Sequence, residues 1–305
     1  AVTFGTVAGL AIIQEDTNAH TTAYDQQKAT LAIRPTAATW KKVSATDSAS
    51  TKHYMTWTSY TEYATLVQSA TNSLNFTVTE TVPARMSGDL KALDGGSLGS
   101  ASDDETGGQL IWRAFWTKDS AKASDLGTFE IVDGKDLSYN NQSSNPNTTG
   151  ALVSEAFASA NNLKVGDTLE VAAASDAKTT AKLKVRGIYK YTSESAVANP
   201  VTAARNRENA IFTNYQTFAK AGLDPQSTDK TVSGWAVPDL DVVFDAGDSA
   251  TYKSLVSTLK KSKLPAKGYE FSSPSLESYN ASLEPLDTLS SRAKTGTIVL
   301  VAVGG

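Results

Sequence analysis

The stretch 151–189 constrains the fold more than any other part of the chain. It opens with three apolar residues, 151–153, which predict a short buried strand. Ser154 follows as a helix N-cap, because its side-chain oxygen can accept a hydrogen bond from a free backbone N–H of the first turn. The next residues, 155–162, have a helical composition, so a helix is expected directly after the strand.

The second half of this stretch predicts a turn and two more strands. Val165, Gly166 and Asp167 form the expected turn, because glycine tolerates positive φ and Asp bonds its own backbone. Apolar and polar residues then alternate over 169–171 and again over 182–186, which is the period-two pattern of half-buried strands. The predicted order is therefore strand, helix, turn and two strands.

This order resembles the core of the MacB-like extracytoplasmic (periplasmic core) domain, which is found in ABC transporter permeases of the MacB/FtsX/lipoprotein-exporter type. The family pattern combines an apolar strand, S-E-x-x-A, a helix, L-x-x-G-D-x-L-x-V and a later V-x-G-I-Y. A strand leading into a short helix over 209–222 follows G-I-Y at about the distance seen in the family. The matching residues serve turns and core packing, and they are Ser154, Glu155, Leu163, Gly166, Asp167, Leu169, Val171, Val185, Gly187, Ile188 and Tyr189.

A strand–helix–strand unit lies on each side of this stretch. In the first unit, 29–33 and 74–82 predict strands, and Ser59 and Glu62 form a capping-box pattern that opens the helix between them. The second unit repeats the order over 239–271. We expect the two units to pack side by side in one sheet with their helices on one face, which makes the fold α+β.

The resemblance implies a porter-like subdomain that is split by a mainly β distal insertion, with helical stalks at both termini. We expect the end of a transmembrane helix plus a stalk over 1–28 and the first half of the porter-like subdomain over 29–85. The distal subdomain is expected over 86–235, the second half of the porter-like subdomain over 236–275, and a stalk plus the start of a transmembrane helix over 276–305.

Both ends of the chain are apolar. The uncharged run 1–13 and the apolar run 297–303 are each shorter than the ~20 residues that a membrane helix needs. The first run also lacks the basic start of a signal peptide. We expect each run to be half of a transmembrane helix, so that the chain lies between two membrane spans; the alternative is two buried terminal strands or helices.

Composition excludes several classes of protein. Lys and Arg number 28 and Asp and Glu 32, and this net charge of −4 argues against a nucleic-acid binder. Cysteine is absent, so disulfides and thiolate metal sites are excluded, and without an HExxH motif no zinc site is expected at His20 or His53. Gly134-Lys135 is followed by Asp136 rather than Ser or Thr, so a Walker A loop for ATP is missing.

Several remaining patterns have a chemical and a structural interpretation. Ser97 lies in a G-x-S-x-G sequence, but it follows no buried strand and both histidines precede it, so a loop is favoured over a hydrolase elbow. We expect a solvated acidic loop at Asp103, Asp104 and Glu105, and the solvent face of a strand and the start of a helix at Asp239, Asp241, Asp245 and Asp248. We expect a helix C-terminus at Lys260, Lys261, Lys263 and Lys267. We expect core packing for Trp112, Phe115 and Trp116, with Trp112 and Trp116 on one strand face.

The resemblance also implies a function. We expect a non-catalytic domain with no catalytic, cofactor-binding or metal residues and no cofactor, whose ATPase activity is on a separate cytoplasmic ABC subunit. The expected partners are that ATPase, a second permease copy in a homo- or heterodimer, and a peptide, lipoprotein or similar substrate or an external protein. The domain would lie on the extracytoplasmic side of the cell membrane, outside a Gram-positive cell. The alternatives are a free-standing bacterial surface binding domain or receptor, and a secreted hydrolase that uses Ser97.

Overall fold

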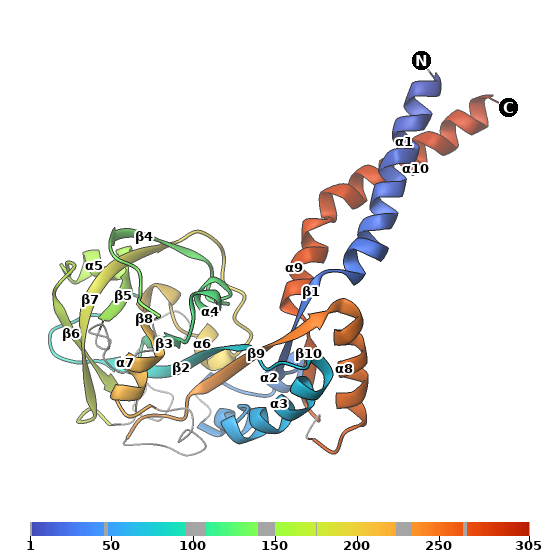
Figure 1. Ribbon diagram of the computed structural model, residues 1–305. Helices are drawn as coiled ribbons and strands as arrows, with labels where there is room; N and C mark the ends of the chain where they lie inside the picture. The colour runs from blue at the N-terminus through green and yellow to red at the C-terminus, as the bar shows by residue number, and fades with distance from the viewer. Residues whose placement is uncertain are drawn as a thin grey trace.

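A computed structural model describes residues 2–45, 48–94, 108–139, 150–174, 176–223, 234–264 and 267–304 of the chain. These residues form an α+β fold with a ten-stranded mixed sheet and helices at both ends, which confirms the predicted fold class (Figure 1). The strands are β1 (Lys28–Pro35), β2 (Phe76–Met86), β3 (Leu110–Phe115), β4 (Phe129–Gly134), β5 (Gly150–Ser154), β6 (Thr168–Ala173), β7 (Thr180–Tyr191), β8 (Ala210–Asn214), β9 (Asp239–Asp248) and β10 (Tyr269–Ser272). The longer helices are α1 (Val2–Asn18), α3 (Trp57–Thr71), α8 (Ser249–Lys261), α9 (Pro274–Ser282) and α10 (Glu284–Gly304); the shorter ones are η1 (Ala19–Ala23), α2 (Ala37–Trp40), η2 (Ser48–His53), α4 (Lys118–Lys122), α5 (Glu155–Ala160), α6 (Pro200–Ala203), η4 (Arg207–Asn209) and α7 (Tyr215–Lys220).

Four strands and two helices form a unit that we call the plait. Its strands lie in the order β10-β1-β9-β2, and each neighbouring pair is antiparallel. Helices α3 and α8 contact each other and cover one face, where a hydrophobic cluster includes Leu31, Tyr63, Val67 and Phe244. This is the strand order of a β-α-β-β-α-β ferredoxin-like unit, and it confirms that the two strand–helix–strand units pack side by side.

Six strands form a second unit that we call the barrel. β2 pairs with β3, β3 with β8, β8 with β5, β5 with β7, β7 with β6, and β6 returns to β2. The ring is therefore closed, and each of its strands has a neighbour on both sides. One hydrophobic cluster takes residues from all six strands, so it fills the inside of the ring, with Trp112 among its largest members.

The β5–β7 segment forms as its sequence predicts. Ser154 Oγ caps α5 by accepting from the Phe157 amide at 3.0 Å. Gly166 takes a positive φ of 100° in the turn before β6. The short strand and helix over 209–222 are also present, as β8 and α7. These local signals are strong because capping and positive φ depend on a few neighbouring residues.

The predicted start of α3 is wrong. The helix begins at Trp57, three residues after Tyr54, and its N-cap is Thr56, whose side chain accepts from the Ser59 amide at 3.1 Å. Ser59 therefore lies inside the first turn and is not the capping residue. The earlier start brings Trp57 against Trp116, with ring centroids 5.8 Å apart, and this tertiary contact favours Thr56 over the equally suitable Ser59.

In the second strand–helix–strand unit of the plait, both ends of α8 lie where the sequence predicts them. Asp248 caps α8 by accepting from the Thr251 amide at 2.7 Å, and Lys260 and Lys261 occupy the last turn of α8. Both placements complement the helix dipole. The domain boundaries stay predictions, and β2 runs across the one expected between 85 and 86.

Trp112 and Phe115 belong to the core, as expected, and Trp116 is half-buried. Trp112 is fully buried inside the barrel, where its Nε1 donates to Thr213 Oγ1 at 3.0 Å and its ring meets Phe218 and Trp235 edge to face. Trp112 and Trp116 face the same side of β3, and Phe115 packs in a separate cluster on the other side.

We expect Trp112→Ala to lower the free energy of unfolding by about 3–5 kcal/mol, because it leaves a cavity inside a closed barrel. Urea denaturation measures this loss. Trp112→Phe keeps a ring in the same place and is the control, which should lose clearly less. A loss below about 1 kcal/mol for the alanine variant would contradict a tightly packed barrel interior.

Candidate functional site

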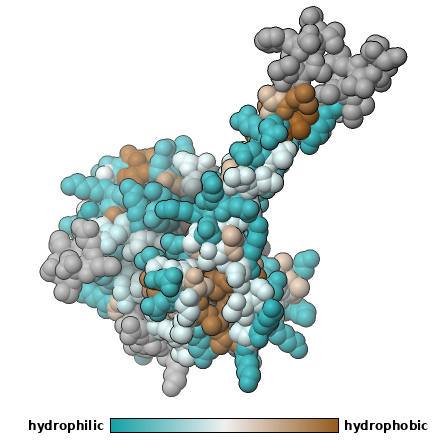
Figure 2. All heavy atoms as spheres, turned by 45° about the vertical axis from the view of Figure 1, so that its right-hand side comes forward, coloured by the Kyte–Doolittle hydropathy of each residue, from teal (hydrophilic) through white to brown (hydrophobic). Residues whose placement is uncertain are grey.

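Helices α1 and α10 pair at one end of the molecule and, together with η1, form what we call the stalk. The two helices run side by side and cross, and both chain termini lie at the outer end of the pair (Figure 1). Exposed apolar surface gathers near that end, where Leu10 is 57% exposed (Figure 2). In the part of the chain that the structure describes, no helix combines the length and the apolar character that crossing a membrane requires.

The stalk is joined to the central strands of the plait through α9. Tyr279 on α9 donates its hydroxyl to the Ala19 carbonyl in η1 at 3.1 Å. Ser275, also on α9, accepts from the Thr30 amide at 2.9 Å and donates to the Lys28 carbonyl at 3.0 Å. Both Thr30 and Lys28 belong to β1, which lies between β10 and β9. Helix α9 therefore connects the stalk to β1 through hydrogen bonds on both sides.

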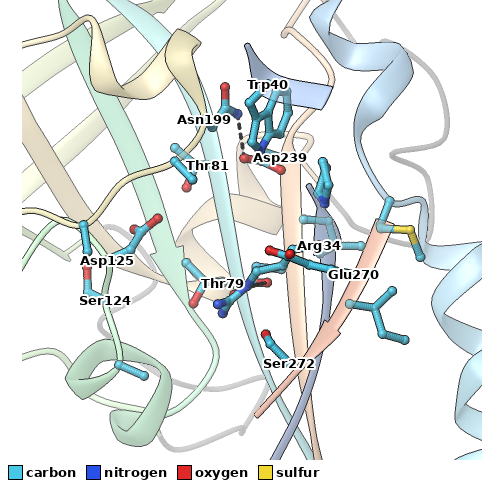
Figure 3. Close-up of a pocket in the computed structure, with 18 of the residues that line it drawn as sticks. Arg34, Trp40, Thr79, Thr81, Ser124, Asp125, Asn199, Asp239, Glu270 and Ser272 are labelled. Carbon is cyan, nitrogen blue, oxygen red and sulfur yellow. Dashed lines mark hydrogen bonds and ion pairs between the residues drawn. The ribbon is translucent and has the colours of Figure 1, made fainter. Parts of the chain in front are cut away.

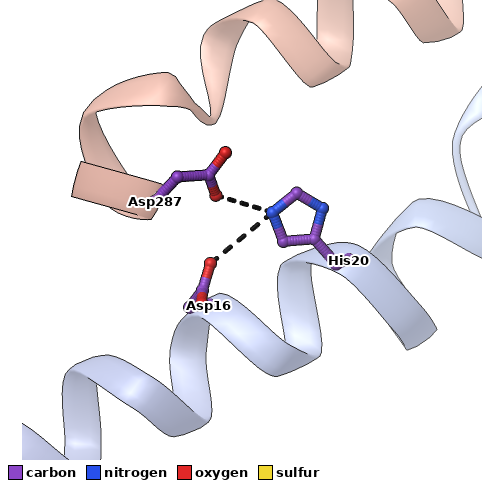
Figure 4. A group of neighbouring side chains, drawn as sticks. All are labelled: Asp16, His20 and Asp287. Carbon is purple, nitrogen blue, oxygen red and sulfur yellow. Dashed lines mark hydrogen bonds and ion pairs between the residues drawn. The ribbon is translucent and has the colours of Figure 1, made fainter. Parts of the chain in front are cut away.

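Three polar side chains meet where the stalk helices approach each other (Figure 4). His20 Nε2 lies 2.6 Å from Asp287 Oδ1 and 3.5 Å from Asp16 Oδ1. Asp16 and His20 come from the first half of the stalk, and Asp287 comes from α10. On α10, Lys294 Nζ lies 3.6 Å from the second Asp16 oxygen. The neighbouring Ser290 hydroxyl is the main cause of a lowered pKa at Asp16, so this carboxyl is ionised at neutral pH.

The second feature is a cavity of about 310 Å³ between the plait and the barrel, which we call the cleft (Figure 3). Arg34 on β1 and Asp241 on β9 form its floor, on the sheet face opposite α3 and α8, and they make a bidentate pair with both N···O distances at 2.8 Å. On the barrel side, the buried Arg113 donates to Thr81 on β2 at 2.9 Å and pairs with Asp125.

The cleft carries more negative than positive charge. Five carboxylates line it against two guanidinium groups. Burial is the largest cause that raises the pKa of Asp239 to about 6, while a hydrogen bond from Asn199 Nδ2 at 2.8 Å opposes this rise. The cleft therefore suits a cationic group better than an anionic one. Its carboxylates are those of Asp125, Asp239, Asp241, Glu270 and Glu277.

We expect Asp239→Asn to stabilise the protein at pH 7 by between about 1 and 3 kcal/mol. The folded pKa of about 6 lies above the unfolded value of 3.8, so the wild type loses stability as pH rises from about 4 to 6. Asn keeps an acceptor for Asn199 and has no such titration. The denaturation curves of the wild type and of Asp239→Asn should coincide at pH 4 and separate at pH 7. An equal difference in the free energy of unfolding at both pH values would contradict the raised pKa of Asp239.

Comparison with known proteins adds one relationship. The chain is similar to a permease of an ABC transporter. It is 26% identical over 179 residues to the uncharacterized ABC transporter permease YclI of Bacillus subtilis (strain 168), and the match spans 59% of this chain and 34% of that protein. No family model matches the chain. The similarity supports a domain associated with an ABC transporter, and it covers about a third of the relative's length.

The structure places the residues singled out in the sequence as follows. His53 ends η2, where its ring meets Trp40 edge to face at 6.1 Å, so its role is in packing. Asp245 is exposed, as expected, but Asp239 and Asp241 are half-buried in the cleft, so the predicted solvent face is wrong for these two. Ser97, Asp103, Asp104 and Glu105 lie outside the described residues.

Sequence reasoning missed both groupings of polar side chains. Asp16 and His20 are four residues apart, a spacing that places them on one helix face and was available as a signal. Asp287 is 267 residues from His20, and only tertiary packing brings the two together. The cleft has the same origin, because its walls come from both units of the sheet.

Proposed function

We propose that this chain is the non-catalytic extracytoplasmic domain of an ABC transporter permease of the MacB/FtsX-like type. The observation that carries the proposal is the paired stalk, which holds both chain ends at one end of a sheet-based body. A body anchored in this way suits a position between two membrane helices. The similarity to an ABC transporter permease supports the association with an ABC transporter in this proposal.

The proposed mechanism is mechanical. A cytoplasmic ABC ATPase moves the transmembrane helices, and the stalk carries this movement through α9 to β1. The plait then moves as a unit because α3 and α8 pack across its strands. Strand β2 belongs to the plait and to the barrel, so the movement reaches the barrel through this strand, about which the two units change their relative angle. A small displacement at the membrane thus becomes a larger one at the distal end, as in hinge movements of rigid bodies.

The partners follow from this mechanism. They are the ATPase, a second permease copy, and a substrate such as a peptide or lipoprotein, or an external protein that the domain activates. The domain would lie on the extracytoplasmic side of the cell membrane, outside a Gram-positive cell. The chemistry of ATP hydrolysis belongs to the separate subunit in this proposal.

Distance measurements between spin labels test the proposal. The chain has no cysteine, so a label pair can be introduced at Glu15 on the stalk and Lys182 on the barrel, both of which are exposed. In the native full-length protein, reconstituted with its ATPase, we expect the Glu15–Lys182 distance distribution to shift by several Å when ATP is bound. Electron–electron double resonance measures this shift.

The control pair is Lys182 with Lys220, because Lys182 lies on β7 of the barrel and Lys220 on α7, which packs against the barrel strands β3 and β8, so both move together in the proposed mechanism. Its distance should be the same with and without ATP. If ATP is hydrolysed and neither pair changes, the domain does not transmit the movement, and the proposal is wrong.

The cleft favours a second candidate, a free-standing surface binding domain or receptor. The native sequence on either side of this chain separates the two candidates. Uncharged flanks that extend 1–13 and 297–303 to about 20 residues support the permease. Polar flanks would support the binding domain, with the cleft as its ligand site.

A further inference from the structure

The polar cluster of the stalk has the composition of a metal site. One imidazole nitrogen and two carboxylate oxygens, from Asp16, His20 and Asp287, all lie within 4.8 Å of one another. Asp16 and His20 share one helix face through their four-residue spacing, and Asp287 approaches from α10 (Figure 4). His20 also lies in the π-helical turn η1, and such turns are frequent at functional sites.

A second observation concerns the Asp16 carboxylate. Asp16 is only 8% exposed, and its Oδ1 is buried without a hydrogen bond among the described residues. Its nearest neighbour in the cluster is His20 Nε2, at the long distance of 3.5 Å. The Ser290 hydroxyl adjoins the same carboxyl, yet neither it nor His20 makes a well-formed hydrogen bond to Oδ1. A cation between Asp16 and His20 would supply the contact that this buried oxygen lacks.

The surroundings leave this oxygen available. Lys294 pairs with the other Asp16 oxygen, Oδ2, at 3.6 Å, so the ammonium group neutralises part of the charge without occupying Oδ1. The open side of the cluster faces solvent, since the side chains of His20 and Asp287 are 43% and 45% exposed. An ion can therefore enter and keep water as a further ligand.

The donor set selects the type of ion. Calcium and magnesium prefer oxygen ligands alone, whereas imidazole together with carboxylates suits zinc and related transition metals. Ligands of a tetrahedral zinc ion lie about 2.0–2.2 Å from the metal, and therefore about 3.3 Å from one another. The 3.5 Å contact between His20 and Asp16 already matches, and the 2.6 Å contact between His20 and Asp287 would open slightly.

We propose that this cluster binds a divalent transition-metal ion of the zinc type, through His20 Nε2, Asp16 Oδ1 and Asp287 Oδ1. The neutral imidazole binds the ion through Nε2 and carries its proton on Nδ1, and the bound ion links α1–η1 to α10. The bound ion fixes the crossing of the two stalk helices. With the extracytoplasmic position taken from the proposed function, metal availability outside the cell would in this way set the stiffness of the stalk.

Zinc titration of the chelator-treated protein tests the proposal. Competition with a chromogenic chelator measures affinity and stoichiometry, and thermal melting measures the stabilisation. We expect one zinc ion per chain and a raised Tm, with no effect of Mg²⁺. His20→Gln and Asp287→Asn should each weaken binding by about tenfold or more, since even the loss of a supporting contact around a metal costs about 10- to 100-fold.

Two variants serve as matched controls. His53→Gln removes the other histidine of the chain, and Asp25→Asn removes an exposed carboxylate just after η1 that pairs with Lys253 instead. Both should bind zinc as the wild type does. Circular dichroism checks that every variant keeps its helix content.

A distance readout separates a bridging ion from a surface-bound one. With spin labels at Glu15 and Arg292, one on each stalk helix, zinc should narrow the distance distribution in the wild-type background and leave it unchanged with Asp287→Asn. The proposal is overturned if the wild type binds no zinc at one equivalent, or if His20→Gln and Asp287→Asn bind it as tightly as the wild type.

Discussion

The architecture depends on one strand that serves two units. Over Phe76–Thr81, β2 pairs with β9 of the plait, and over Ala84–Met86 it pairs with β6 of the barrel. Pro83 falls in the gap between these two pairings, where its missing N–H leaves no ladder bond unmade. Because β3 runs along the other side of β2 across this gap, the two units share continuous backbone hydrogen bonding and cannot separate without breaking a sheet.

Side chains on both faces of β2 reinforce this joint. On the face that carries the hydrophobic cores, the buried Glu80 accepts from Trp116 Nε1 at 2.8 Å, and Trp116 packs between Trp57 and Tyr215. On the opposite face, Thr81 and Arg113 form one wall of the cleft. Polar groups thus lie between two separate hydrophobic cores. Buried polar contacts demand defined geometry, so the relative orientation of plait and barrel is specified by these bonds and not by apolar packing alone.

The stalk and the cleft are both connected to β1, a central strand of the plait. The stalk contacts β1 through α9, and the cleft includes Arg34 near the end of that strand and Asp241 on its neighbour β9. Movement of β1 relative to the barrel would therefore change the shape of the cleft. This connection gives the proposed transmission a structural route, and it offers a way for a ligand in the cleft to resist or favour movement of the stalk.

The sequence by itself determined the local structure. Ser154, Gly166 and Asp248 specify a helix start, a turn and a second helix start, and period-two alternation marks β6, β7 and β9, because capping, positive φ and strand patterning depend on residues close in the chain. Tertiary structure alone decided the closed barrel, the start of α3, the cleft and the meeting of His20 with Asp287. Each of these depends on contacts between residues far apart in sequence, and neither the local patterns nor the repeated strand–helix–strand order specifies those contacts.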